Sequence, residues 1–232
     1  MPTLTPTKDT GGQAKASGLL YVEPDLVMTD DELAGLAPDV GMNVPFVMDV
    51  VSAMLAHERC GVHLYRSVAG RTNNPMLKRR YDSAQDAVLE AVTVLEGLVT
   101  SAGGNPSYVS PAARAAQGMD TKLLESTFAL NGSLDVMTQE MAMLDAVLLA
   151  ESMAKANWET FAVLAGQLPD GELKTSFQEA ADEVGPVKDE GFTWAKETKM
   201  KMVLLQSESR MMTAVGAKAE ELVETVKGWF SD

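Results

Sequence analysis

Apolar residues recur at intervals of three and four along most of the chain beyond residue 40, which is the period of an amphipathic helix. In the first two segments of this kind, an asparagine stands just before a proline, and this pair is typical of a helix N-terminus. No run of alternating β-branched residues predicts a strand. We therefore expect an all-α fold with long helices over about 43–70, 74–103, 133–166 and 171–205.

The links between these helices predict their topology. Short turns, "RTNNP" and "QLPDG", join the first helix to the second and the third to the fourth, so each pair should form an antiparallel hairpin. The connection over 105–132 is long enough to cross the bundle from end to end, and it holds two short helical pieces, "SPAARAAQG" and "DTKLLESTFALNG". These features predict a four-helix bundle with one crossover. Pro186 should kink the fourth helix.

Three regions follow from this division. The bundle is expected over 41–206. Residues 1–40, rich in Thr, Pro and Gly, predict an N-terminal arm that is partly extended. Residues 207–232 end in an amphipathic pattern and predict a helical C-terminal extension, whose apolar side should cover the bundle or another subunit.

Two carboxylates lie where apolar residues are expected. At about 100° per residue, Glu58 falls on the midline of the apolar stripe of the first helix, and Glu151 does the same in the third. A buried carboxylate is costly unless it is neutralised, paired or bound to a cation. Each is followed seven residues later by an aromatic residue on the same face, Tyr65 or Trp158, whose polar edge can bond a carboxylate or close the end of a site.

The spacings Glu-x6-Tyr and Glu-x6-Trp, the long crossover and the "SAGGNP" after the second helix resemble the ferritin-like superfamily, which includes rubrerythrins and bacterioferritins. The resemblance covers roughly 44–205 and implies a ferritin-like four-helix bundle. In that family the first and third helices each give a Glu, here Glu58 and Glu151, and the others each give Glu-x-x-His, which together hold two metal ions. The family implies iron or manganese, with oxygen or peroxide chemistry or metal handling, a homo-oligomer, and Tyr65 and Trp158 beside the metal ligands.

The second and fourth helices depart from this pattern, because neither contains Glu-x-x-His. In the second helix, the best match places Glu90 at the edge of the core face. A match shifted by one residue gives Val88 and Ala91 instead. In the fourth, Glu183 matches best, with proline in place of the histidine, and Glu190 follows one heptad later. The candidate metal ligands are therefore Glu58, Glu151, Glu183, Glu90 and Glu190.

The two histidines, His57 and His63, lie away from the Glu58 stripe, about 100° and 140° around the helix, so capped or surface positions are expected for both.

A metal-free core is the alternative hypothesis. Lys155 lies about 40° from Glu151 on the same helix, and Arg59 and Arg66 flank the face that carries Glu58. These cations would neutralise the carboxylates and leave a scaffold or binding protein without a cofactor. The cofactor is therefore either iron or manganese, as the resemblance implies, or none.

Charge and composition narrow the possible partners. The formal net charge is −14, which argues against nucleic acid because phosphate needs a basic face. No run of about 18 apolar residues predicts a membrane span. One cysteine, Cys60, excludes an internal disulfide and fits a reducing compartment. With no secretory signal in the first residues, a cytoplasmic protein is expected.

Overall fold

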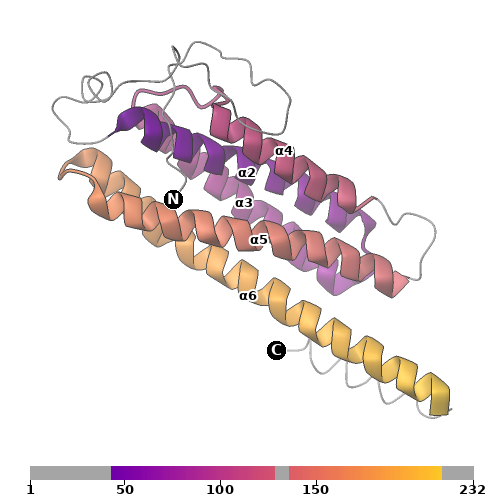
Figure 1. The fold of residues 1–232 in the computed structure, drawn as a ribbon. Helices are drawn as coiled ribbons and strands as arrows, with labels where there is room; N and C mark the ends of the chain where they lie inside the picture. The colour runs from indigo at the N-terminus through magenta and orange to yellow at the C-terminus, as the bar shows by residue number, and fades with distance from the viewer. Residues whose placement is uncertain (1–42, 129–135, 216–232) are drawn as a thin grey trace, which may run out of the picture.

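The computed structural model describes residues 43–128 and 136–215, and all its elements within these ranges are α-helices (Figure 1). The all-α class predicted from the sequence is confirmed for this part of the chain. The predicted N-terminal arm and residues 216–232 of the predicted C-terminal extension lie outside it. The helices are α2 Val44–Arg71, α3 Pro75–Ser101, α4 Pro111–Ser126, α5 Val136–Gln167 and α6 Glu172–Val215.

Side-chain caps start the first three of these helices, and the first two caps are those that the sequence predicts. The Asn43 side chain accepts a hydrogen bond from the Phe46 amide at 3.1 Å, and Asn74 caps α3 in the same way. Ser110 caps α4. A proline occupies one of the first two positions of each helix, where the missing amide proton costs nothing.

The end of α3 is fixed by its glycines. Gly103 has a φ of 79°, a conformation that glycine adopts without a steric penalty. The Gly104 amide donates to the Val99 carbonyl at 2.8 Å, and the Gly103 amide donates to that of Thr100 at 2.9 Å. These two bonds form a Schellman motif, which turns the chain away from the helix axis.

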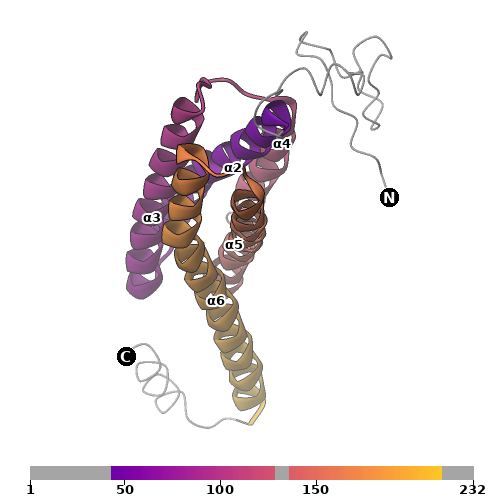
Figure 2. The ribbon, with the colours of Figure 1, turned by 90° about the vertical axis from the view of Figure 1, so that its left-hand side faces the viewer.

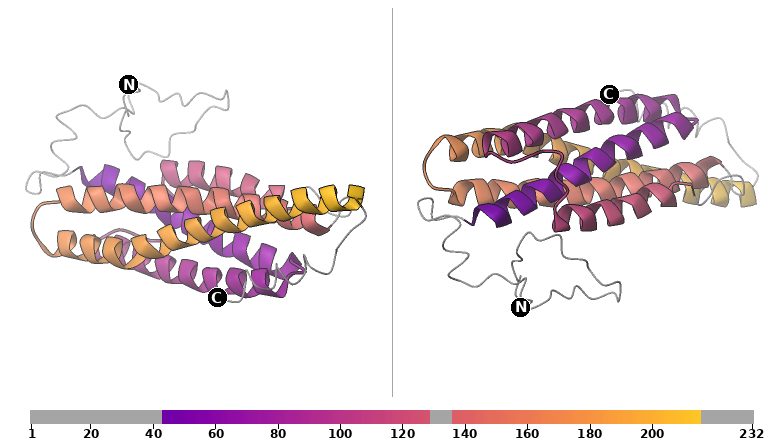
Figure 3. Two further views of the ribbon diagram at one scale, coloured as in Figure 1. Left: turned by 90° about the horizontal axis from the view of Figure 1, so that it is seen from below. Right: turned by 90° about the horizontal axis from the view of Figure 1, so that it is seen from above.

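The long helices pack as two hairpins placed side by side. In sequence, α2 is joined to α3 and α5 to α6 by short turns, and each pair packs closely. The hairpins meet where α2 contacts α5 and α3 contacts α6 (Figures 2 and 3). Buried Glu140, near the start of α5, accepts hydrogen bonds from the Thr72 hydroxyl and the Asn73 amide, so it ties α5 to the turn between α2 and α3.

The connection between the hairpins is more ordered than expected. Its described residues, 105–128, contain one helix, α4, instead of parts of two short pieces, and α4 lies against both α2 and α5 (Figure 1). Gly118, which separates the two predicted pieces, lies inside this helix, because one interior glycine costs a helix only about 1 kcal/mol. Small residues of α4, Ala113 and Ala116, pack against Ala56 of α2 and allow the two helices to approach closely.

Helix α6 continues through Pro186, so this proline does not divide the helix. Pro186 is exposed, and water can bond the carbonyl that the proline leaves without a donor. The helix also runs past residue 206, the predicted end of the bundle, to Val215. None of the helices in the described ranges combines the length and apolarity that a membrane crossing requires.

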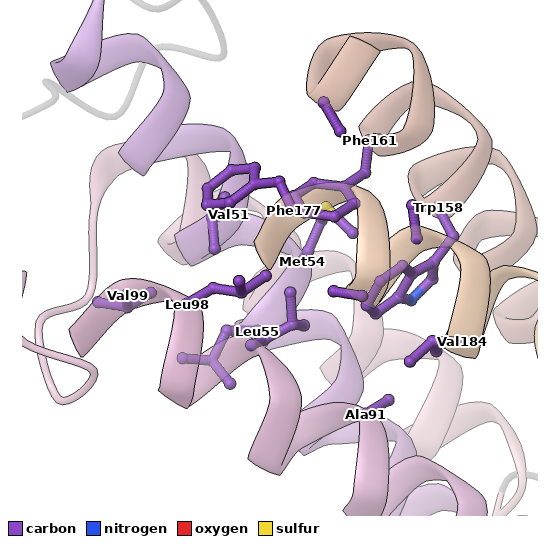
Figure 4. Packing of buried hydrophobic residues seen from close by; sticks show 14 of the residues in the cluster. Val51, Met54, Leu55, Ala91, Leu98, Val99, Trp158, Phe161, Phe177 and Val184 are labelled. Carbon is purple, nitrogen blue, oxygen red and sulfur yellow. The ribbon is translucent and has the colours of Figure 1, made fainter. Parts of the chain in front are cut away.

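Besides the small cluster between α2 and α4, the core of the described residues has two larger apolar clusters, one toward each end of the hairpins. The first contains Trp158, Phe161 and Phe177, whose rings are in contact (Figure 4). The second contains Tyr65 and Tyr81, with Trp194 packed against it. In α2, α5 and α6 the two clusters are separated by a short stretch of helix, and these stretches hold four buried polar residues: His57, Glu58, Glu151 and Lys188.

Candidate functional site

Five buried side chains form what we call the polar layer: Glu58, Tyr65, Glu151, Trp158 and Lys188. Glu58 and Glu151 fall between the two apolar clusters along α2 and α5, as Lys188 does along α6. Tyr65 and Trp158 belong to the clusters and turn their polar atoms toward the carboxylates. The layer therefore joins three of the long helices at one level of the core.

Glu58 is neutralised inside the core by a lysine. The Lys188 ammonium donates to Glu58 Oε2 at 2.6 Å, and the Trp158 indole donates to Glu58 Oε1 at 2.8 Å. Lys188 is only 2% exposed. Both carboxylate oxygens thus have a donor, one of them charged, which is what a buried carboxylate needs to remain ionised.

Glu151 is held differently. It accepts a hydrogen bond from the Tyr65 hydroxyl and lies against Gly191 of α6. Burial raises the pKa of the Glu151 carboxyl above its usual value, although Lys188 and the Tyr65 hydroxyl act in the opposite direction. The charge of Glu58 raises this pKa further. Both carboxylates therefore interact with one lysine.

The two carboxylate–aromatic contacts are reciprocal. Each glutamate bonds the aromatic residue of the opposite hairpin, Glu58 with Trp158 and Glu151 with Tyr65. A step of seven residues up α2 corresponds to a step of seven down α5, so the two helices run antiparallel at this level. The sequence-based expectation that the aromatics bond the carboxylates is confirmed, with each bond made across the two hairpins.

A histidine bridge links α4 to the same region. His57 is buried, with Nδ1 3.0 Å from both carboxylate oxygens of Asp120 and Nε2 3.1 Å from the Ala150 carbonyl oxygen. Both partners are acceptors when Asp120 is ionised, so both ring nitrogens donate and the ring carries a proton on each. Burial lowers the pKa of His57, but the hydrogen bond and charge of Asp120, with smaller contributions from Glu58 and Ala150, outweigh it and raise the pKa overall.

Of the two alternatives expected for His57, a capped or a surface position, the surface position is wrong, and the ring is capped by hydrogen bonds at both nitrogens. Its side of α2 is covered by α4, which the sequence did not place there. His63 is exposed, as expected.

Three of the predicted metal ligands lie away from the polar layer. Glu90, Glu183 and Glu190 are exposed, and Glu190 accepts a hydrogen bond from Arg80 at 2.8 Å. The prediction that Glu183 lines a site inside the bundle is wrong, because the following residue, Val184, is the one that faces the core. Of the five candidate carboxylates, the structure brings together Glu58 and Glu151.

The predicted neutralising cations are also elsewhere. Lys155 pairs with Asp189 and Glu159, and its side chain is 30% exposed. Arg59 pairs with Glu96 at the surface at 2.7 Å, and Arg66 is exposed. The cation that contacts Glu58 in the core is Lys188, which the sequence reasoning missed.

The resemblance to the ferritin-like superfamily implies Glu-x-x-His in the second and fourth helices. In α3 the alternative match, Val88 and Ala91, is buried. In α6 the best sequence match, Glu183 and Pro186, is exposed. The residues of α6 that meet the polar layer are instead Lys188 and Gly191, three apart, which contact Glu58 and Glu151.

These residues do not fit a pair of metal ions. Valine, alanine and glycine side chains offer no ligand, and a protonated lysine repels a cation. Across residues 43–128 and 136–215, no three His, Cys, Asp or Glu side chains come together in a group able to hold a metal ion.

No family model, curated protein or solved structure gives a significant match to this chain. The resemblance to the ferritin-like superfamily therefore depends on the spacing of the carboxylates and aromatics and on the helix order.

Replacing Lys188 should uncover the cost of the buried carboxylate. Lys188→Met leaves Glu58 without its cation, and we expect the free energy of unfolding in urea to fall by about 3–5 kcal/mol. The double variant Glu58→Gln/Lys188→Met removes both charges and should recover at least half of this loss. Lys155→Met is the control. Lys155 lies outside the polar layer and pairs with Asp189, so this substitution should change the free energy of unfolding only slightly. Equal effects of the two lysine substitutions would contradict the assignment.

Gly191 should not tolerate a side chain. A Cβ atom there would lie 2.5 Å from Oε2 and 3.1 Å from Cδ of Glu151. Alanine is the better helix former by about 1 kcal/mol, but we expect Gly191→Ala to lower the free energy of unfolding by about 1–3 kcal/mol through overpacking. Gly97→Ala in α3, where a Cβ meets nothing within 4 Å, should be neutral or stabilising. If Gly191→Ala raised the free energy of unfolding as much as Gly97→Ala, Glu151 would not need the space that Gly191 leaves.

The histidine bridge should make stability depend on pH. Because the pKa of His57 is raised on folding, its contribution is complete below the unfolded value of about 6.5 and is lost as pH rises through the folded pKa. Unfolding free energies measured from pH 5.5 to 9 should therefore decline in the wild type. The decline should be smaller in His57→Gln and unchanged in His63→Gln. If His57→Gln shows the wild-type profile, the bridge carries no proton-linked stability.

Proposed function

We propose that the chain is a ferritin-like helical scaffold without a metal cofactor, in which a lysine takes the place of the metal ions. The observation that carries this proposal is the contact of Lys188 with Glu58, at a position that faces the polar layer. An ammonium group supplies the positive charge that two facing carboxylates require, and it is tethered to the chain. Gly191, on the next turn, leaves room for Glu151.

The polar atoms of the layer also hydrogen-bond to one another. Lys188 and Trp158 bond the two oxygens of Glu58, and Tyr65 bonds Glu151. A metal ion would have to displace these bonds and work against a buried positive charge. The same groups give no nucleophile or general base with access to solvent. We therefore place the chain with binding or structural proteins rather than with enzymes.

The outer surface supports such a role. Leu149 and Val163 on α5 are large, apolar and exposed, and they are fourteen residues apart, so they project from the same side of the helix. These two side chains are the contacts on α5 that a protein partner would use under this proposal. A homo-oligomer, which the resemblance also implies, would use a surface of this kind.

Metal analysis tests the proposal against its competitor, an iron or manganese protein. Protein purified without chelators should contain iron and manganese far below one equivalent, and adding Fe²⁺ or Mn²⁺ should leave its melting temperature unchanged. A bound ion at a hundred times its Kd would instead add about 2.7 kcal/mol to stability. Glu58→Ala and Glu151→Ala are the matched controls. Near-stoichiometric metal in the wild type that both variants lose would overturn the proposal.

A further inference from the structure

The last described turns of α6 are apolar on two opposite faces. Met202 and Leu205 are buried against the second core cluster or beside it. On the other side Met200, Val203 and Leu204 are 58%, 44% and 54% exposed. Their spacing of three and four residues places them in one stripe along the helix. We call these three residues the outer stripe of α6.

The outer stripe is confined to the last described turns of α6. One turn earlier, the same side of α6 carries the exposed charged residues Lys196 and Glu197, as a solvated helix face should. The change from charged to apolar side chains occurs where α6 still lies beside α5, because Lys199 pairs with Asp145 of that helix. A helix that becomes apolar on its solvent side at this point indicates that another element covers it.

The chain beyond α6 has the length and the pattern to provide that element. Gly216 follows the last residue of α6, and glycine at this position commonly reverses the chain after a helix. In the sequence after it, apolar residues recur at helical spacing: Ala219, Leu222, Val223, Val226 and Phe230.

The lengths of the two segments on either side of Gly216 also agree. Fifteen residues of helix separate Met200 from Val215, about 22 Å at 1.5 Å per residue. The fourteen residues 217–230, if helical, would reach back about 21 Å, to the level of the outer stripe.

We propose that residues 217–230 fold back after Gly216 as an antiparallel helix and cover the outer stripe of α6. In this arrangement Val226, Trp229 and Phe230 lie over Met200, Val203 and Leu204. The occupant is a segment of the same chain because it is joined directly to the end of α6, so it competes at a far higher effective concentration than a second molecule. The outer stripe has no charge of its own that would orient a separate partner.

Cross-linking in the full-length chain tests this pairing. Cys60→Ser removes the native thiol, and Ser207→Cys places a new one on the side of the outer stripe, three residues beyond Leu204. The second thiol is introduced by Val226→Cys, on the apolar side of the segment, or by Glu224→Cys, on its polar side about 200° away. Both pairs are nearly equally separated along the chain, so a short bismaleimide distinguishes them by orientation.

We expect the Val226→Cys pair to form an intramolecular cross-link about tenfold faster than the Glu224→Cys pair, because docking concentrates one thiol near the other. Leu204→Glu in the same background should abolish the difference, and Glu197→Gln should preserve it; circular dichroism verifies that each variant is folded. Equal rates in the two pairs would overturn the proposal. Cross-linked dimers that increase with protein concentration would overturn it too, and would assign the stripe to a second copy of the chain.

Discussion

The ion pair between Lys188 and Glu58 determines how the middle of the core is arranged. Two carboxylates from opposite hairpins face the same space, and a low dielectric makes their like charges costly unless a cation lies beside them. Lys188 provides that cation from α6, while Glu151, whose pKa is raised by burial, can relieve the remaining charge by holding a proton. The aromatic donors Tyr65 and Trp158 then fix where each carboxylate points.

A buried pair of this kind contributes less to stability than its contacts suggest, because desolvation offsets most of the attraction between the charges. We infer that its main effect is on register. Moving α6 by one turn along α2 would separate Lys188 from Glu58 and would bring a side chain into the space that Gly191 leaves for Glu151. An apolar core would tolerate such a slip more easily, because apolar contacts have little directional preference.

Much of this arrangement could be predicted from the sequence, and the failures have physical causes. Glu58 and Glu151 lie on the midlines of apolar stripes, so their burial followed from helical periodicity alone. The burial of Lys188 on α6 could not be predicted in this way, because the expected kink at Pro186 obscured the helical register of the residues that follow it. Lys155 is only 40° from Glu151, yet its long side chain reaches the surface and pairs there, as lysines at the edge of a core commonly do.

His57 shows a different limit of sequence reasoning. Its angle on α2 is incompatible with the bundle core, and periodicity gives no information about a connection that packs outside the bundle. The position of α4, and with it the partner Asp120, depends on contacts between residues more than sixty positions apart. Tertiary packing decides such a contact, and no local pattern in the sequence encodes it.

A tethered ammonium and a bound metal ion both neutralise facing carboxylates, but they differ in what they permit. A metal ion can dissociate, change its oxidation state or open a coordination position to a substrate. Lys188 cannot do any of these, and its burial beneath the apolar clusters keeps the polar layer from solvent. In the scaffold that we propose, a fixed electrostatic contact therefore takes the place of chemistry at the layer, and a partner would bind the helix surfaces, where the exposed apolar residues of α5 and α6 are found.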